Sequence, residues 1–141
     1  MRIYQAGPLF SEAEIAWHKS FRDTLVAAGH EVVWPGDLVS EKDVAAWGEE
    51  APRRIYEMDR QAIDTADVVV ALLDGAQVDD GTAWEMGYAT GRGIPVVGLR
   101  TDFRRAGETA QSAVNAMIEG SCAALCRTVG EVLETLKSLP F

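Results

Sequence analysis

The sequence predicts a single doubly wound α/β domain, flavodoxin-like or Rossmann-like, with a central parallel sheet of about five strands flanked by helices. Short apolar, strand-like runs alternate with segments of helical periodicity along the chain. One run, residues 66–74, contains the unbroken Val-Val-Val-Ala-Leu-Leu pattern of a strand buried on both faces. The 141 residues suit one domain with a sizeable core, and we expect that domain to span residues 1–141.

The first half of the chain is expected to form two strands around a helix. Residues 2–6 read as a short strand that Gly7-Pro8 ends. A helix is expected over residues 11–28, because apolar residues recur at helical spacing and Ser11 and Glu14 are spaced as a capping box. A second strand is expected over residues 30–34. Residues 35–52 are expected to form a long, partly acidic loop, and such loops are often binding elements or lids.

The second half repeats the alternation of helices and strands. Helices are expected over residues 53–65 and 82–92, the latter closed by Gly93, and they flank the buried run at 66–74. The remaining elements are expected to be a strand at 94–99, a helix at 110–120, a strand at 123–126 and a final helix at 128–139, whose Thr128 and Glu131 again have capping-box spacing.

Composition and charge narrow the classes of function. A formal net charge of −9 argues against a nucleic-acid partner, because affinity for polyphosphate depends on basic residues. The longest apolar stretch, residues 68–73, is far too short to cross a bilayer, so we expect a cytoplasmic protein without a membrane partner. Cys122 and Cys126 are expected to be core thiols. The sequence has no dinucleotide-binding or phosphate-binding glycine loop, and we expect neither a cofactor nor a metal.

The loops that follow the strands are the expected place for a ligand, because doubly wound sheets bind ligands beyond the carboxyl ends of their strands. One of these loops holds Asp74, Asp79 and Asp80 and leads directly to Glu85. Thr82 and Glu85 also have the spacing of a capping box, and aspartates beside glycine are common turn formers. Spacing alone therefore leaves a catalytic and a purely structural interpretation of these residues open.

Four segments, taken together, carry a resemblance. They are Y-Q-A-G-P-L-F at residues 4–10, D-D-G-T-A-W-E-M-G-Y-A at 79–89, G-I-P-V at 93–96 and N-A-M-I at 115–118. In this order and near this spacing they resemble the nucleoside 2-deoxyribosyltransferase family. The D-x-G-T-A-x-E part of the second segment is the most specific. The resemblance covers most of the chain, and residues 35–52 match it least.

The resemblance implies a catalytic set. Glu85 would attack C1' of a 2'-deoxynucleoside and hold the sugar as a covalent ester until another purine or pyrimidine base takes it. Tyr4 would hold the Glu85 carboxylate through its hydroxyl group, Asp59 would handle the leaving base, and Asp79 would contact the base or sugar. A carboxylate is a known covalent nucleophile towards oxocarbenium-like sugars, so the chemistry suits the residue type.

The resemblance also implies substrate contacts and partners. Its substrates would be deoxynucleosides and free nucleobases. Asn115 and Met117 would reach into a neighbouring subunit's site, with Asn115 bonding the sugar 5'-hydroxyl, so a homo-oligomer is expected. Among the tryptophans we favour Trp47 for stacking on the base. The remaining expected substrate contacts are Ala6, Gly7, Phe10, Asp37 and Gly81.

Two alternatives remain open at this stage. The first is an N-glycosidase that cleaves nucleoside 5'-monophosphates with water. Asn115 favours a substrate with a free 5'-hydroxyl group. A 5'-phosphate would instead need contacts from arginines, and the candidates are Arg92, Arg100, Arg104 and Arg105. The second alternative belongs to another class, a flavodoxin-like nucleotide-binding or signalling module whose acidic cluster holds Mg²⁺.

Overall fold

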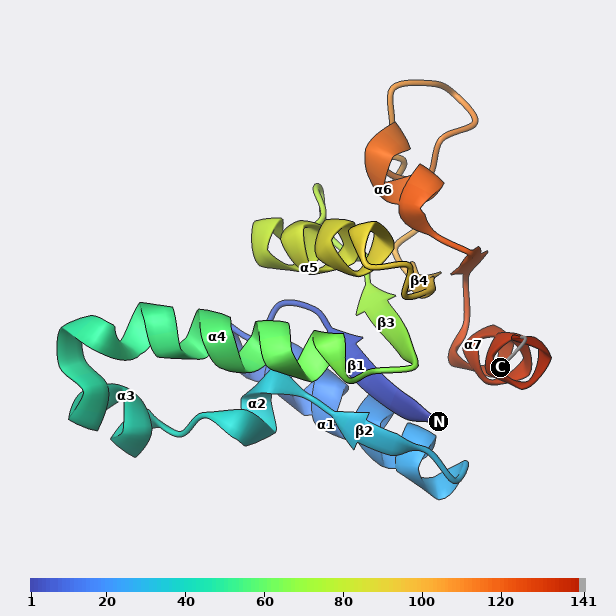
Figure 1. Ribbon diagram of the computed structural model, residues 1–141. Coiled ribbons are helices and arrows are strands. Elements are labelled where there is room, and N and C mark those ends of the chain that lie inside the picture. Colours follow the sequence, from blue (N-terminus) through green and yellow to red (C-terminus); the bar gives the residue numbers. More distant parts are fainter. Residues whose placement is uncertain (140–141) are drawn as a thin grey trace.

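A computed structural model describes residues 1–139 and contains one five-stranded, all-parallel sheet in the order β2-β1-β3-β4-β5 (Figure 1). The strands are β1 (Arg2–Ala6), β2 (Glu31–Val33), β3 (Val68–Leu72), β4 (Val96–Leu99) and β5 (Ala124–Cys126). The chain changes direction along the sheet after β2, which is the arrangement of a doubly wound fold. The predicted fold class is therefore confirmed.

Helices cover both faces of the sheet (Figure 1). Side chains of β3 alternate between the faces, because successive residues of a strand point to opposite sides. Val68, Val70 and Leu72 pack with α1 (Glu12–Ala27) and α7 (Val129–Ser138). Val69 and Ala71 pack instead with α4 (Ala51–Asp64) and α5 (Asp80–Gly91). All five residues of β3 are buried, as the unbroken apolar run predicts.

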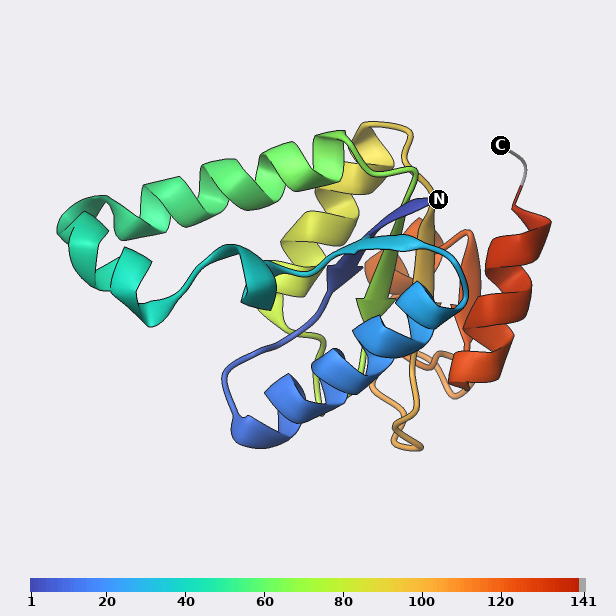
Figure 2. The same ribbon diagram turned by 90° about the horizontal axis from the view of Figure 1, so that it is seen from below.

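The segment expected to be a long loop is mostly helical. It contains α2 (Pro35–Leu38), α3 (Glu41–Trp47) and the 3₁₀ helix η1 (Gly48–Glu50), which leads directly into α4. Proline occupies the first turn of α2, where its missing N–H is tolerated. Ser40 and Asp43 form a capping box at α3, with Asp in place of the more usual Glu. Figure 2 shows this segment extending beside α4, away from the sheet.

A second correction concerns the helix expected at residues 110–120. The helix found there, α6 (Ala116–Ser121), begins six residues later. Asn115 caps it by accepting a hydrogen bond from the Met117 N–H, and Glu108 reaches across to accept one from the Ala116 N–H. The residues before Asn115 instead form turns, in which the Thr109 hydroxyl accepts the Ser112 N–H. Local side-chain bonds therefore hold this segment out of the helix.

The remaining expectations for the scaffold are met in most respects. The capping box of Ser11 and Glu14 is present at α1. At α7, Thr128 accepts the Glu131 N–H as expected, but the Glu131 carboxylate bonds the N–H of Arg127. Cys122 and Cys126 are free thiols, and only Cys126 is fully buried. Within residues 1–139, no helix combines the length and apolar character needed to cross a bilayer.

Candidate active site

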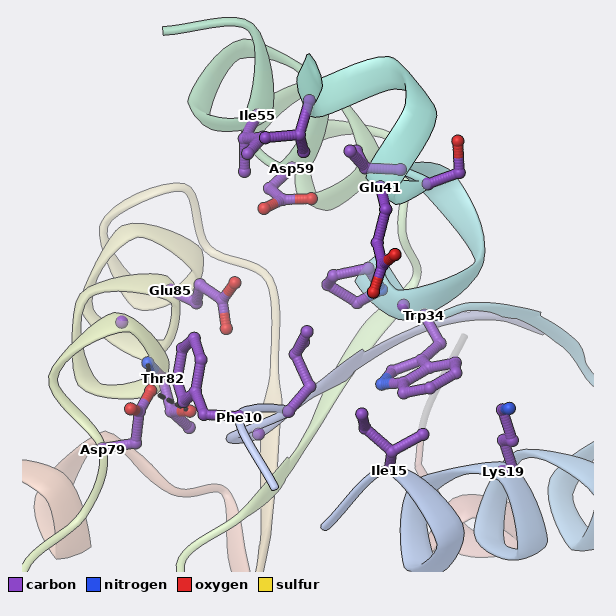
Figure 3. A pocket seen from close by; sticks show the side chains of 18 of the residues that line it. Phe10, Ile15, Lys19, Trp34, Glu41, Ile55, Asp59, Asp79, Thr82 and Glu85 are labelled. Atoms are coloured by element: carbon purple, nitrogen blue, oxygen red, sulfur yellow. Dashed lines mark hydrogen bonds between the residues drawn. The ribbon is translucent and has the colours of Figure 1, made fainter. Parts of the chain in front are cut away.

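A cavity of about 690 Å³ opens at the carboxyl ends of β1, β2 and β3 (Figure 3). Its walls come from the loop after β1, from α1, from the α2–α3 segment, and from α4 and α5. Figure 3 shows Glu85, Asp79 and Thr82 at one end and Trp34, Ile15 and Lys19 at the other. The position is the one that the doubly wound topology favours for a ligand.

Glu85 projects from α5 into this cavity and is tied to the centre of the sheet. Its Oε1 accepts a hydrogen bond of 2.5 Å from the Tyr4 hydroxyl group. Tyr4 lies in β1 and is completely buried. The hydrogen-bond partner of Glu85 is therefore fixed in the core, although it lies 81 positions away in the chain.

Glu85 does not act as a helix cap. Helix α5 begins at Asp80, and its N-cap is Asp79, whose Oδ2 accepts hydrogen bonds from both the N–H and the hydroxyl group of Thr82, each 2.9 Å long. The capping-box interpretation of Thr82 and Glu85 is therefore wrong. Because Asp79 accepts the free N–H group at the start of α5, the Glu85 side chain is not needed as a cap. It projects into the cavity from the next turn of the helix.

Asp59 supplies a second carboxyl group to the same cavity, from α4. Its Oδ1 is buried and has no hydrogen-bond partner among the described residues. Burial raises the pKa of Asp59 to about 6, because a carboxylate loses its hydration when it is removed from water. An unpartnered, protonatable carboxyl group is thus available to a ligand.

The pKa of Glu85 is raised further, to about 8. Burial is the main cause, the hydrogen bond from Tyr4 opposes it, and the negative charges of Asp59 and Asp79 add to the rise. Burial and the charge of Glu85 also raise the pKa of Tyr4, which therefore remains a hydrogen-bond donor. Strongly perturbed carboxyl groups that share a cavity are a frequent mark of an active site.

The cavity brings together half of the residues singled out from the sequence. Tyr4 lies directly behind it and Ala6 is buried in β1. Of the other expected residues, those that line the cavity are Gly7, Phe10, Asp59, Asp79, Gly81 and Glu85. Gly7 is required by close packing, because a Cβ atom at that position would lie 2.3 Å from the ring of His18.

Besides Tyr4 and Ala6, four expected residues do not line the cavity. Asp37 pairs with Arg22, at 2.6 and 2.7 Å from one guanidinium nitrogen. Trp47 lies under the guanidinium group of Arg54, 5.7 Å from its ring centre. Asn115 caps α6 and Met117 lies in its first turn, where Met117 is 79% exposed. The last two could reach a substrate only in another subunit.

Sequence reasoning missed much of the apolar end of the cavity. Trp34, which lines the cavity, is buried, and a Cβ atom on Gly36 would lie 2.3 Å from its indole ring. Helical spacing is the signal that could have identified two others. Ile55 precedes Asp59 by four residues on α4, and Ile15 precedes Lys19 by four on α1, so each pair shares a helix face. The other unanticipated lining residues are Leu9, Pro35, Val39, Ser40, Glu41, Val44 and Ala45.

The arginines considered for phosphate binding have other partners. Arg100 is completely buried, and its guanidinium group donates to the carbonyl oxygens of Leu73, Gly75 and Arg104. Arg92 bonds Asp64, and Arg104 bonds Asp102. Neither these arginines nor Arg105 lines the cavity, where Lys19 is the one cationic residue among the described residues.

Asp74 has a structural role. Its Oδ1 accepts the N–H groups of Thr101 at 2.7 Å and Asp102 at 2.9 Å, and so ties the loop after β3 to the loop after β4. Over residues 1–139, no group of three or more His, Cys, Asp or Glu side chains is arranged to hold a metal ion.

The solved structures that resemble this chain include those of two named enzymes. A 2-deoxyribosyltransferase from Bacillus psychrosaccharolyticus is 25% identical, with a TM-score of 0.78 over 100% of this chain and 93% of that one. A CMP N-glycosidase from Clostridium botulinum is 18% identical, with a TM-score of 0.62 over 97% of this chain and 99% of that one. The second likeness concerns the fold alone.

Sequence comparison gives the family. An uncharacterised protein of Schizosaccharomyces pombe is 32% identical in an alignment of 115 residues that covers 78% of this chain and 54% of that protein. The chain thus spans about half the length of this curated relative. A profile of the family described as nucleoside 2-deoxyribosyltransferase matches residues 3–117, a range that includes every residue of the cavity. The chain therefore belongs to the nucleoside 2-deoxyribosyltransferase family.

Proposed function

We propose that this protein transfers 2-deoxyribose from one nucleobase to another, with the Glu85 carboxylate as the nucleophile. The observation that carries the proposal is the arrangement of Glu85, which lies in the cavity with its carboxyl group bonded to the buried Tyr4 hydroxyl group. That bond fixes one oxygen of the carboxylate and leaves the other for a sugar carbon. Membership of the family and the likeness to a 2-deoxyribosyltransferase support the same activity.

The reaction proceeds in two displacements. In the first, a Glu85 oxygen forms a bond to C1' while the bond from C1' to the base nitrogen breaks, and the electron pair leaves with the base. In the second, a nitrogen of the incoming base attacks C1' and releases the carboxylate. Each displacement inverts C1', so the β configuration of the donor is kept in the product.

Asp59 moves the proton that this exchange requires. It protonates the departing base, which would otherwise leave as an anion and is a poor leaving group in that form. It then recovers a proton from the incoming base. Glu85 and Asp59 have raised pKa values of about 8 and about 6, so the pair carries a single proton between these pH values. The active form is the one in which this proton is on Asp59 or the base and Glu85 is ionised.

The charge of the cavity favours an uncharged substrate. Four carboxyl groups line it, from Glu41, Asp59, Asp79 and Glu85, against the single ammonium group of Lys19. A 5'-phosphate would be repelled by these carboxylates, so a nucleoside fits better than a nucleoside monophosphate. For this reason we place transfer between nucleosides ahead of the glycosidase activity that the name of the Clostridium botulinum protein states.

The site is completed by a second copy of the chain in this proposal. Asn115 caps α6 through Oδ1, and its Nδ2 donates to Glu108 at 2.6 Å. Nδ2 carries a second N–H, which remains for a hydroxyl oxygen. We assign this group to the sugar 5'-hydroxyl in a neighbouring subunit, with Met117 beside it, and we therefore expect a homo-oligomer.

The test is a chromatographic assay of the purified protein with 2'-deoxyinosine or thymidine, with and without adenine or cytosine, repeated with the 5'-monophosphates. A new deoxynucleoside that forms only with an acceptor base supports the transferase. Release of free base mainly from monophosphates would replace this proposal with the glycosidase. The Glu85→Gln variant should lose nearly all turnover, whereas Glu14→Gln, at a partly exposed glutamate of the α1 capping box outside the cavity, should keep it.

A further inference from the structure

The cavity is larger than a nucleoside requires. Its volume is about 690 Å³. A 2'-deoxynucleoside has about 18 non-hydrogen atoms and, at the packing density of a protein interior, fills roughly half of such a space. The end that holds Glu85 and Asp59 accounts for the reacting groups, so the remaining space is available to a ligand larger than a simple nucleoside.

The unused space is an apolar recess. We define the base recess as the part of the cavity lined by Ile15, Trp34, Val39, Val44, Ala45 and Ile55. Figure 3 shows Ile15 and Trp34 facing Glu85 from across the cavity, with Ile55 beside Asp59. Several apolar side chains are left to water here, and Val44 is 41% exposed. Burial of such surface by a ligand is favourable.

The order of residues along α4 gives the direction of the recess. Asp59, which handles the base in the proposed function, is preceded on the same helix face by Ile55, four residues earlier and about 5–6 Å away between Cβ atoms at this spacing. Beyond Ile55, α4 packs against α3, which carries Val44 and Ala45. A base whose ring nitrogen points to Asp59 and the sugar therefore directs its opposite edge into the base recess.

The floor of the recess is closely packed. The Trp34 indole lies over Gly36, where any larger residue would collide with it. Lys19, Ser40 and Glu41 are the polar residues at this end, and the Ser40 hydroxyl is bonded to Asp43 in the cap of α3. The recess thus offers shape and apolar surface and few polar contacts.

We propose that the enzyme accepts nucleobases that carry an apolar substituent on the edge remote from the glycosidic nitrogen, such as an alkyl or benzyl group on the exocyclic amine of adenine. This inference rests on the proposed function, since it assumes that Asp59 marks the position of the base. It narrows the substrate class to bases larger than the common ones.

The experiment compares N6-benzyladenine with adenine as acceptors of deoxyribose from thymidine. Burial of a benzyl group contributes about as much as burial of a phenylalanine side chain, so the KM for N6-benzyladenine should be about tenfold lower than for adenine. The Val44→Asp variant should reduce this preference towards unity. The matched control is Val26→Asp, at a 52% exposed valine of α1 outside the cavity, which should retain the preference.

The outcomes separate the two proposals. Transfer to adenine with refusal of N6-benzyladenine would overturn the base recess and leave the transferase intact, and so would a preference that Val44→Asp does not change. No transfer to either base would overturn the proposed function and this inference with it. Binding of both bases to Glu85→Gln, measured by calorimetry, gives the same comparison without turnover.

Discussion

Replacement of Glu85 by glutamine should abolish turnover and at the same time stabilise the fold. Glu85 has a pKa of about 8 in the folded protein against an ordinary value of 4.5. The native state therefore keeps a proton that the unfolded chain has lost, and the free energy of unfolding falls as the pH rises from about 4.5 to 8. Glutamine occupies the same space and carries no charge, so it escapes this penalty.

The magnitude follows from the two pKa values. Near neutral pH the buried carboxyl group lowers the free energy of unfolding by about 3 kcal/mol, and near pH 5 by less than about 1 kcal/mol. The amide of glutamine brings a second donor N–H group into the buried site, and leaving it without a partner returns about 1 kcal/mol. The net gain near neutral pH is about 2 kcal/mol, or about 6–8 °C in Tm for a chain of this size.

The assay is thermal unfolding of wild type and Glu85→Gln at several pH values, beside the transfer assay. The difference in Tm should grow as the pH rises from about 5 to 8. Glu14→Gln is the control of opposite sign, because hydrogen bonds from the Ser11 cap lower the pKa of Glu14, so the ionised form favours folding. A Glu85→Gln variant that melts earlier than wild type across this range, or that retains turnover, would refute the reasoning.

Three further predictions concern pH and packing. For wild type, the plot of kcat/KM against pH should be bell-shaped, with its limbs at about pH 6 and 8. Asp59→Asn should leave only a limb that rises with pH as Glu85 ionises, with a midpoint below 8, and an unchanged bell-shaped profile would exclude Asp59 from the proton transfer. Tyr4→Phe deletes a hydrogen bond that lowers the Glu85 pKa, so the alkaline limb should move up by about one pH unit, which a pH–rate profile would reveal. Gly36→Ala should lower the Tm, since its Cβ would lie 2.3 Å from the buried indole ring of Trp34. Gly87→Ala in α5, whose Cβ would meet no other part of the protein within 4 Å, should raise or maintain the Tm, and equal Tm values for the two variants would show that the Trp34 ring moves freely.

The sheet could be predicted from the sequence because its strands are short apolar runs between clear breaks. The run at 68–72 is buried on both faces, and only a parallel sheet with helices on each side accommodates that. The α2–η1 segment escaped prediction because its helices are very short and the Ser40 cap pairs with Asp43 in place of a glutamate. Helices of this length have little periodicity to detect.

The site was predictable only as far as local pattern and resemblance reach. Spacing could not decide whether Glu85 caps α5, since the true cap, Asp79, lies six positions before it. The bond between Tyr4 and Glu85 depends on how β1 and α5 pack, and no local pattern encodes such a contact. The same holds for Trp34, which reaches the cavity while Trp47 packs under Arg54 on the outside.

The two ends of the cavity differ in how deeply the residues that form them are buried. Tyr4 is completely buried in the sheet, whereas α2, α3 and η1 contain no buried residue at all. Local opening costs least where little apolar surface is buried, so backbone amides of the α2–η1 wall should exchange with deuterium well before those of β1. If the proposed function holds, substrates can enter by displacement of this wall alone, while the Glu85 carboxylate keeps its position. Under the proposed function, changes within residues 35–50 would then alter the bases accepted without altering the bond between Tyr4 and Glu85.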